Sequence, residues 1–244
     1  SITQSSTKSL RVLCFLVKLC GTKKQIMLKK DKTHLQNYNA AIQNEWLETN
    51  GLGGWSGSSI IGCHTRRYHG LLVAATKPPT ERTVLLSKLD ETIIINDEKF
   101  ELGVNDYGEV IHPNGNQYVK SFTKELFPQW MYEVNGIQLK KTIAMIHGEN
   151  TVVVIYDIVK AKKPFKMELL PLMAGRFYHS LQHASEQMHW DADFDNGTFH
   201  NKPDGMQDVY INIPGSVYRH EPRWFNNFNC AVEKYRGQDF TEDL

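Results

Sequence analysis

The sequence predicts a mostly-β protein, built as a β-sandwich with little helix. From Ser58 onward, short apolar or alternating runs rich in Val, Ile and Leu recur along the chain, and such runs are typical of strands. Turn residues separate these runs at short spacing, which is the pattern of a sandwich. After Met27 no long 3.6-residue periodicity is visible, and only Thr33–Trp46 is compatible with a short helix.

Six runs carry the strand prediction. They are Tyr68–Ala75, Thr83–Ile95, Gln129–Val134, Ile137–Ile146, Thr151–Val159 and Lys166–Ala174. The dipeptide Asn135-Gly136 stands between two of them, and Asn-Gly tolerates the positive φ angles that a tight hairpin turn requires. We expect further turns at Asn96-Asp97 and at Asn196-Gly197.

Length and charge narrow the classes of partner. The 244 residues suffice for one large all-β domain or two small ones. The 28 basic and 27 acidic residues leave a net charge of +1, which argues against nucleic acid and against an anionic membrane as partners.

The apolar run Leu10–Leu19 is too short for a membrane span, which needs roughly 20 apolar residues. Residues 1–26 are predicted to be upstream read-through outside the fold, with Met27 as the natural start, and a targeting leader is the alternative.

The cysteines and acidic residues predict neither a metal nor a cofactor. Cys14, Cys20, Cys63 and Cys230 include no C-x-x-C pair, and a zinc site needs closely spaced soft ligands. Scattered thiols fit a reducing compartment, so we predict a cytoplasmic location. The run Asp191, Asp193, Asp195 stands before a turn signal. It favours a solvated hairpin over a calcium site.

The segment of residues 45–55, EWLETNGLGGW, contains three glycines within four positions. Glycines at this density allow a sharp turn or a close approach of the backbone. A phosphate-binding loop does not fit, because no strong strand precedes the glycines and no Gly-Lys-Ser/Thr follows them. A tight turn into the first strand is the favoured interpretation.

Residues 65–74, TRRYHGLLVA, place two arginines and a histidine at the start of an apolar strand. On a strand, Arg66 and Tyr68 would share one face, and Arg67 and His69 would share the other. Burying these groups is costly unless they are paired. One interpretation is anchoring by ion pairs; the other is that the guanidinium groups line a sugar-binding or domain-contact surface. The candidate ion-pair partners are Glu45, Glu48 and Asp90.

These segments together carry a family resemblance. The motifs are EWL at 45–47, TNGLGG at 49–54, TRRYHGLLVA at 65–74, TVLLSKL at 83–89, RFYHSL at 176–181, WFNNF at 224–228, EK at 233–234, RG at 236–237 and DFTEDL at 239–244. In this order they resemble the N-terminal domain of bacterial and archaeal glycogen-debranching enzymes of the amylo-α-1,6-glucosidase type. The likeness runs from about Glu45 to Leu244.

The resemblance implies a β-supersandwich similar to galactose-mutarotase-like domains, followed in the family by an (α/α)6 barrel. That barrel hydrolyses the α-1,6-linked glucose at a branch of glycogen or starch and holds the family's catalytic carboxylates. We therefore expect no catalytic residue here and no activity from this fragment alone. On this view residues 27–244 form the N-terminal domain, cut before its last strand, and the barrel is absent. An open sheet edge and an uncovered apolar face would then make the isolated chain associate.

Sugars stack on aromatic rings and accept hydrogen bonds from arginine and amide groups. On this chemistry the candidates for contact with substrate or with the barrel are Arg66, Arg67, His69, Arg176, Tyr178, His179, Trp224, Asn226 and Asn227. The expected partner is an α-glucan such as glycogen, starch or a maltooligosaccharide. A self-sufficient carbohydrate-binding module is the alternative from another class. A mutarotase-like enzyme with His and Glu as acid and base is a third hypothesis.

Overall fold

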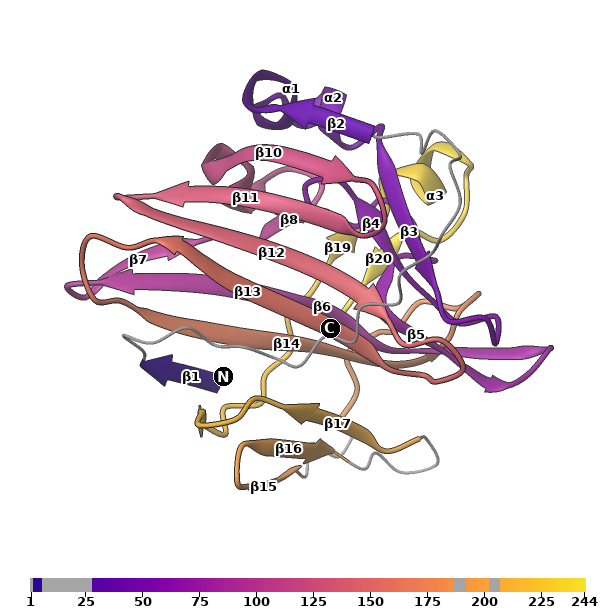
Figure 1. The fold of residues 1–244 in the computed structure, drawn as a ribbon. Coiled ribbons are helices and arrows are strands. Elements are labelled where there is room, and N and C mark those ends of the chain that lie inside the picture. Colours follow the sequence, from indigo (N-terminus) through magenta and orange to yellow (C-terminus); the bar gives the residue numbers. More distant parts are fainter. Residues whose placement is uncertain (1, 6–27, 187–191, 202–206) are drawn as a thin grey trace, which may run out of the picture.

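The computed structural model describes residues 2–5, 28–186, 192–201 and 207–244 (Figure 1). The chain is mostly β and antiparallel throughout, as the sequence predicts. Strand β1 (Ile2–Ser5) pairs with β14 (Lys166–Phe177). The assignment of residues 1–26 to a leader stays a prediction, because residues 6–26 lie outside the described residues.

The larger sheet has eight strands. Their order is β18-β1-β14-β6-β5-β4-β3, and β7 pairs with β6 off this path. Besides β1 and β14, the strands are β3 (Glu45–Thr49), β4 (Trp55–Ser59), β5 (Gly70–Lys77), β6 (Glu81–Ile95), β7 (Glu98–Glu101) and β18 (Val217–Tyr218). The long strands β6 and β14 lie side by side in the middle of this sheet. They pair with each other from Ile94–Lys166 to Thr83–Phe177.

The second sheet has five strands in the order β13-β12-β11-β10-β2. They are β2 (Leu28–Asp31), β10 (Val119–Lys124), β11 (Pro128–Val134), β12 (Ile137–Met145) and β13 (Val152–Lys160). The smaller sheets contain β8 (Val104–Asp106) and β9 (Ile111–Asn114), β15 (Ala192–Asp195), β16 (Thr198–Asn201) and β17 (Val209–Asn212), and β19 (Phe228–Asn229) and β20 (Thr241–Glu242). The helical elements are α1 (Lys32–Gln36), α2 (Tyr38–Ala41), α3 (Ala231–Tyr235) and the 3-10 turn η1 (Gly115–Tyr118).

The two large sheets pack face to face around one core (Figure 1). Trp46 of β3 meets Trp130 of β11 edge to face, with 5.4 Å between ring centroids. The indole nitrogen of Trp130 donates to the carbonyl of Ile60 at 2.6 Å, which satisfies its one polar group in the core. Alternation along β11 buries Trp130, Tyr132 and Val134, as a strand with one face toward a core requires.

The predicted strands and turns are confirmed with small shifts at their ends. Asn135 and Gly136 have φ values of 43° and 85° between β11 and β12. The turns at Asn96-Asp97 and at Asn196-Gly197 also have positive φ at both residues. Helices α1 and α2 fall in the segment that allowed a short helix.

The acidic run lies partly within the described chain. Asp193 and Asp195 are exposed on β15, in the hairpin that the sequence predicts, and Asp191 lies outside the described residues. Among the residues that the structure describes, no group of three or more His, Cys, Asp or Glu side chains is placed to hold a metal ion. The helices of this part of the chain are all too short or too polar to cross a membrane.

The C-terminal segment covers the outer face of the eight-stranded sheet. Phe228 and Leu244 pack with Val73 of β5, Val84 of β6 and Leu172 of β14 in a second core cluster. This packing brings the last motifs of the sequence against the strands that carry the earlier ones.

Candidate functional site

Arg176 of β14 joins three of the sequence motifs. It is 6% exposed, and its Nε and Nη2 atoms both donate to the carboxylate of Glu242 on β20, the latter at 3.0 Å. Nη2 also donates to the main-chain carbonyl of Arg67 at 2.8 Å. A bidentate arginine–carboxylate pair fixes both distance and orientation. The motifs at 65–74, 176–181 and 239–244 therefore meet at one point.

Arg67 extends this connection to the rest of the C-terminal segment. Its Nη1 donates to the carbonyl of His179 at 2.8 Å, and its Nη2 donates to the carbonyl of Asp239 at 2.9 Å and to Gln238 Oε1 at 3.1 Å. Its Nε lies 3.6 Å from Oε2 of Glu233, which is fully buried on α3. We call Arg67, Arg176, Glu233 and Glu242 the arginine network.

The start of the 65–74 motif differs from the prediction. Residues 65–69 form a turn in which the His69 N–H donates to the Arg66 carbonyl at 3.1 Å, and the strand begins at Gly70. The predicted sorting of Arg66 with Tyr68 and of Arg67 with His69 onto two strand faces is therefore wrong. Because the chain turns here, Arg66 and His69 both reach Glu45.

The interpretation as an ion-pair anchor is confirmed for Glu45. Arg66 Nε lies 2.6 Å from its Oε1 and His69 Nε2 lies 3.4 Å away. The Thr65 N–H donates to His69 Nδ1 at 3.1 Å, which leaves the ring proton on Nε2, facing Glu45. The hydrogen bond with His69 and the ion pair with Arg66 lower the pKa of Glu45 to about 2. Of the two other proposed partners, Glu48 pairs with Lys124 and Asp90 with Lys88.

Five rings gather beside the arginine network. We call this set the aromatic face: Trp55, Tyr68, Phe177, Tyr178 and His179. Tyr178 lies at its middle, with ring centroids 5.7 Å from Trp55, 6.0 Å from Tyr68 and 3.9 Å from His179. The Tyr68 hydroxyl and His179 Nδ1 are 3.1 Å apart, and the Trp55 indole donates to the Tyr68 carbonyl at 2.9 Å. Phe177 is 46% exposed and His179 is exposed, so the face is open to a partner.

The glycine-rich motif supports this face through a residue that the sequence did not single out. Asn50 is fully buried, and its Oδ1 accepts from the N–H groups of Leu52 and Gly54, each at 2.9 Å. Its Nδ2 donates to Oδ1 of Asn150, whose own amide bonds to both main-chain groups of Ala75 in the manner of a neighbouring strand. This pair ties the tight turn before Trp55 to the β12–β13 loop. The chain turns here as predicted, but the turn joins β3 to β4, so the expectation that no strand precedes the glycines is wrong.

The WFNNF motif at residues 224–228 is held in the same region by hydrogen bonds to Asp243. The Asn227 N–H, at a residue with φ of 65°, donates to Asp243 Oδ1 at 2.7 Å. The other oxygen of Asp243 accepts from the Ala184 N–H at 2.8 Å. The segment is thereby held beside the loop that follows His179. Trp224 is half-buried there and Asn226 is exposed.

The site contains carboxylates, but they are already engaged. Glu233 and Glu242 are 0% and 3% exposed and face arginines. Glycoside hydrolysis needs two carboxyl groups placed on either side of the scissile bond. Neither of these carboxylates is free to take that position, whereas the exposed rings of the aromatic face suit a sugar or a protein surface.

The comparison with known proteins agrees with this arrangement. A family model described as "Glycogen debranching enzyme N terminal" matches residues 44–244. No curated protein and no solved structure gives a significant match to the chain. The matched region spans every motif that converges on the arginine network and the aromatic face. The chain belongs to the family of glycogen-debranching-enzyme N-terminal domains.

Proposed function

We propose that this chain is a non-catalytic domain that supports an (α/α)6 amylo-α-1,6-glucosidase barrel and helps to shape its α-glucan cleft. The parent enzyme would be a cytoplasmic glycoside hydrolase of glycogen or starch breakdown. One observation carries the proposal: the family motifs converge on one region, where the arginine network is buried and the aromatic face is open.

The chemistry of the two parts supports a division of roles. Within the arginine network the guanidinium groups of Arg67 and Arg176 donate to main-chain carbonyls, and that of Arg176 also donates to the Glu242 carboxylate. We therefore assign them a positioning role. Direct contact with the barrel or the sugar falls to Phe177, Tyr178 and His179, because rings of this kind are enriched at interfaces and stack on sugars.

A carbohydrate-binding module that acts by itself is the second candidate. The observation that favours it is the exposure of Phe177 and His179 next to the half-buried ring of Tyr178. A module would bind a maltooligosaccharide without any partner domain. A domain that only completes the cleft of a barrel would bind such a sugar far more weakly on its own.

Two measurements on the purified chain test these roles. Incubation with a limit dextrin is expected to release no glucose, and titration with maltoheptaose in a calorimeter is expected to give no saturable heat. Glucose release would refute the non-catalytic role. Saturable heat that disappears in Phe177→Ser, but persists in Val110→Ser at an exposed residue of the β8–β9 loop, would favour the module.

A further inference from the structure

His179 is an exposed residue whose side chain and main chain are both held in place. It follows the end of β14, and its main-chain carbonyl accepts a hydrogen bond from Arg67 Nη1 at 2.8 Å. Its ring lies against that of Tyr178 with 3.9 Å between centroids, and it packs edge-on against Phe177 and Tyr68 at 5.4 and 5.5 Å. An exposed side chain ordinarily keeps its rotamer freedom, so a ring restrained by three neighbours is pre-organised for a contact.

Tyr68 sets the direction of this ring through a hydrogen bond. Its hydroxyl oxygen lies 3.1 Å from His179 Nδ1. A phenol gives up its proton more readily than a neutral imidazole does, so the hydroxyl donates and Nδ1 accepts. The neutral ring then carries its own proton on Nε2, because the hydrogen bond at one ring nitrogen decides which nitrogen is protonated. The Nε2–H group points away from Tyr68.

The main chain around Tyr68 is fixed by two other motifs. The indole nitrogen of Trp55 donates to the Tyr68 carbonyl at 2.9 Å. Arg176 Nη2 donates to the carbonyl of Arg67, the residue before Tyr68, at 2.8 Å. The Tyr68 hydroxyl therefore reaches His179 from a supported main chain. In this way the buried arginine network determines the position of an exposed ring.

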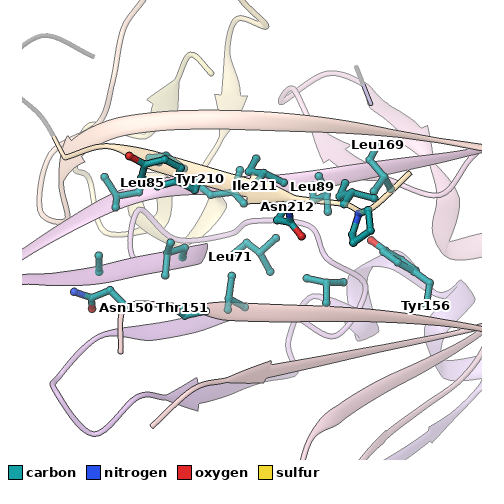
Figure 2. Close-up of a pocket in the computed structure, with 18 of the residues that line it drawn as sticks. Leu71, Leu85, Leu89, Asn150, Thr151, Tyr156, Leu169, Tyr210, Ile211 and Asn212 are labelled. Atoms are coloured by element: carbon teal, nitrogen blue, oxygen red, sulfur yellow. The ribbon is translucent and has the colours of Figure 1, made fainter. Parts of the chain in front are cut away.

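A cavity elsewhere in the molecule offers a different chemistry (Figure 2). It has a volume of about 530 Å³ and lies between the two large sheets and β17. Its walls are mainly aliphatic, and they include Leu71, Leu85, Leu89 and Leu169, which Figure 2 labels. A polyol placed against such walls would lose hydrogen bonds to water without replacement. The aromatic face matches a sugar better, because flat rings and a nitrogen donor lie together there.

We infer that Tyr68 is a positioning residue, which holds His179 with its Nε2–H group as the donor to a hydroxyl oxygen of the α-glucan. This inference rests on the proposed function. Phe177 is 46% exposed and would stack on the apolar face of the same sugar unit. The Phe177 and His179 centroids are 5.4 Å apart, so one sugar unit can span both rings. An apolar ring beside a neutral donor suits an uncharged polyol.

NMR of the chain, with its histidines labelled with nitrogen-15, tests the orientation of the ring. In alkaline buffer, where histidine rings are neutral, the His179 proton should be on Nε2 and Nδ1 should accept a hydrogen bond. Tyr68→Phe keeps the aromatic ring but removes the hydroxyl, and should move the Nδ1 resonance toward that of free histidine. Tyr235→Phe makes the same change at a side chain that is 92% exposed and should have no effect. A wild-type proton on Nδ1, or equal spectra for wild type and Tyr68→Phe, would overturn the inference.

Glucose release by the chain together with a separately expressed barrel tests the sugar contact. Tyr68→Phe should raise the KM for a limit dextrin by about three- to tenfold, which corresponds to one neutral hydrogen bond, and should leave kcat nearly unchanged. A glutamine at position 179 has its amide nitrogen close to the place of Nε2, and an asparagine has it close to the place of Nδ1. His179→Gln should therefore keep a lower KM than His179→Asn.

The outcomes separate this inference from the proposed function. If the wild-type chain stimulates the barrel, a wild-type KM in Tyr68→Phe or a lower KM in His179→Asn than in His179→Gln would refute the role of Tyr68 and leave the support role standing. A wild-type chain that gives no stimulation would contradict the support role and the sugar contact with it. The NMR spectra would in that case still decide whether Tyr68 positions His179.

Discussion

Arg176 donates from Nη2 to the carbonyl oxygen of Arg67 at 2.8 Å, which links residues 109 positions apart. The same guanidinium group holds the Glu242 carboxylate, and both side chains are more than nine-tenths buried. A buried guanidinium group that donates hydrogen bonds in two fixed directions restricts the movement of the strand and the loop that it joins. The aromatic face is therefore supported by a rigid base.

Replacing Arg176 with Met should strongly destabilise the chain. Loss of one partner leaves the Glu242 carboxylate buried and uncompensated, which costs about 3–5 kcal/mol. We expect the Tm in calorimetry to fall by about 10 °C. Lys77→Met, which breaks a pair whose lysine is 73% exposed, should change stability by less than about 1 kcal/mol. Equal effects of the two variants would contradict the structural role of the arginine network.

A double-mutant cycle separates the ion pair from general packing. Arg176→Met combined with Glu242→Met removes both charges, so it should cost less than the sum of the two single variants. Additive costs, measured by urea unfolding, would show that the two side chains do not act as a pair.

Glu45 should make stability depend on pH in the acid range. Its folded pKa of about 2 lies below the ordinary value of 4.5, so its contribution is complete above pH 4.5 and is lost as pH falls toward 2. Because the side chain is 35% exposed, solvent screening limits the effect to about 1 kcal/mol. Glu45→Gln should flatten the urea-unfolding free energy between pH 4.5 and 2 relative to wild type. An unchanged slope would exclude this pair as the source.

Asn50→Ala should destabilise the chain by about 2–4 kcal/mol. The change leaves the Leu52 and Gly54 N–H groups without their acceptor and removes one of the two donors to Asn150 Oδ1, in a buried setting. Asn212→Ala is the matched control, because Asn212 is exposed and its amide donates to Thr198 Oγ1 at 2.7 Å. Chemical unfolding of both variants should separate them clearly. Similar losses would contradict the anchoring role of Asn50.

The thiols of Cys63 and Cys230 should not react in the folded chain. Both are free and buried, and burial raises the pKa of both, to about 12 for Cys230. Peptide mapping after iodoacetamide treatment at pH 8 should find these two residues unlabelled, and fully labelled in urea. Rapid labelling of Cys230 without denaturant would show that the region around Arg176 opens readily.

The sequence could predict those features of the fold that depend on residues close together in the chain. Runs of β-branched residues and the Asn-Gly turn between β11 and β12 depend on neighbours in the chain, so the strands and hairpins agree with the structure. The sequence also singled out Arg67, Arg176 and the segment that contains Glu242. It did not predict that they pair, because the partners lie 66 or more residues apart and only the folded sheet brings them together.

Contacts between residues far apart in the sequence also explain which predictions were wrong and which residues were missed. The apolar run after Tyr68 extended the predicted strand too far, because Glu45, from another strand, holds Arg66 and His69 in a turn. The bond between Asn50 and Asn150 could not be predicted, since it joins amides 100 positions apart.

The support role is tested most directly by supplying the chain in trans to a separately expressed (α/α)6 glucosidase barrel of the same enzyme and following glucose release from a limit dextrin. We predict that the wild-type chain raises turnover in a saturable way. The Phe177→Ser, His179→Ala double variant should fold normally and fail to raise it, and Val110→Ser should behave as wild type. Full stimulation by the double variant, or turnover by the chain without the barrel, would contradict the account.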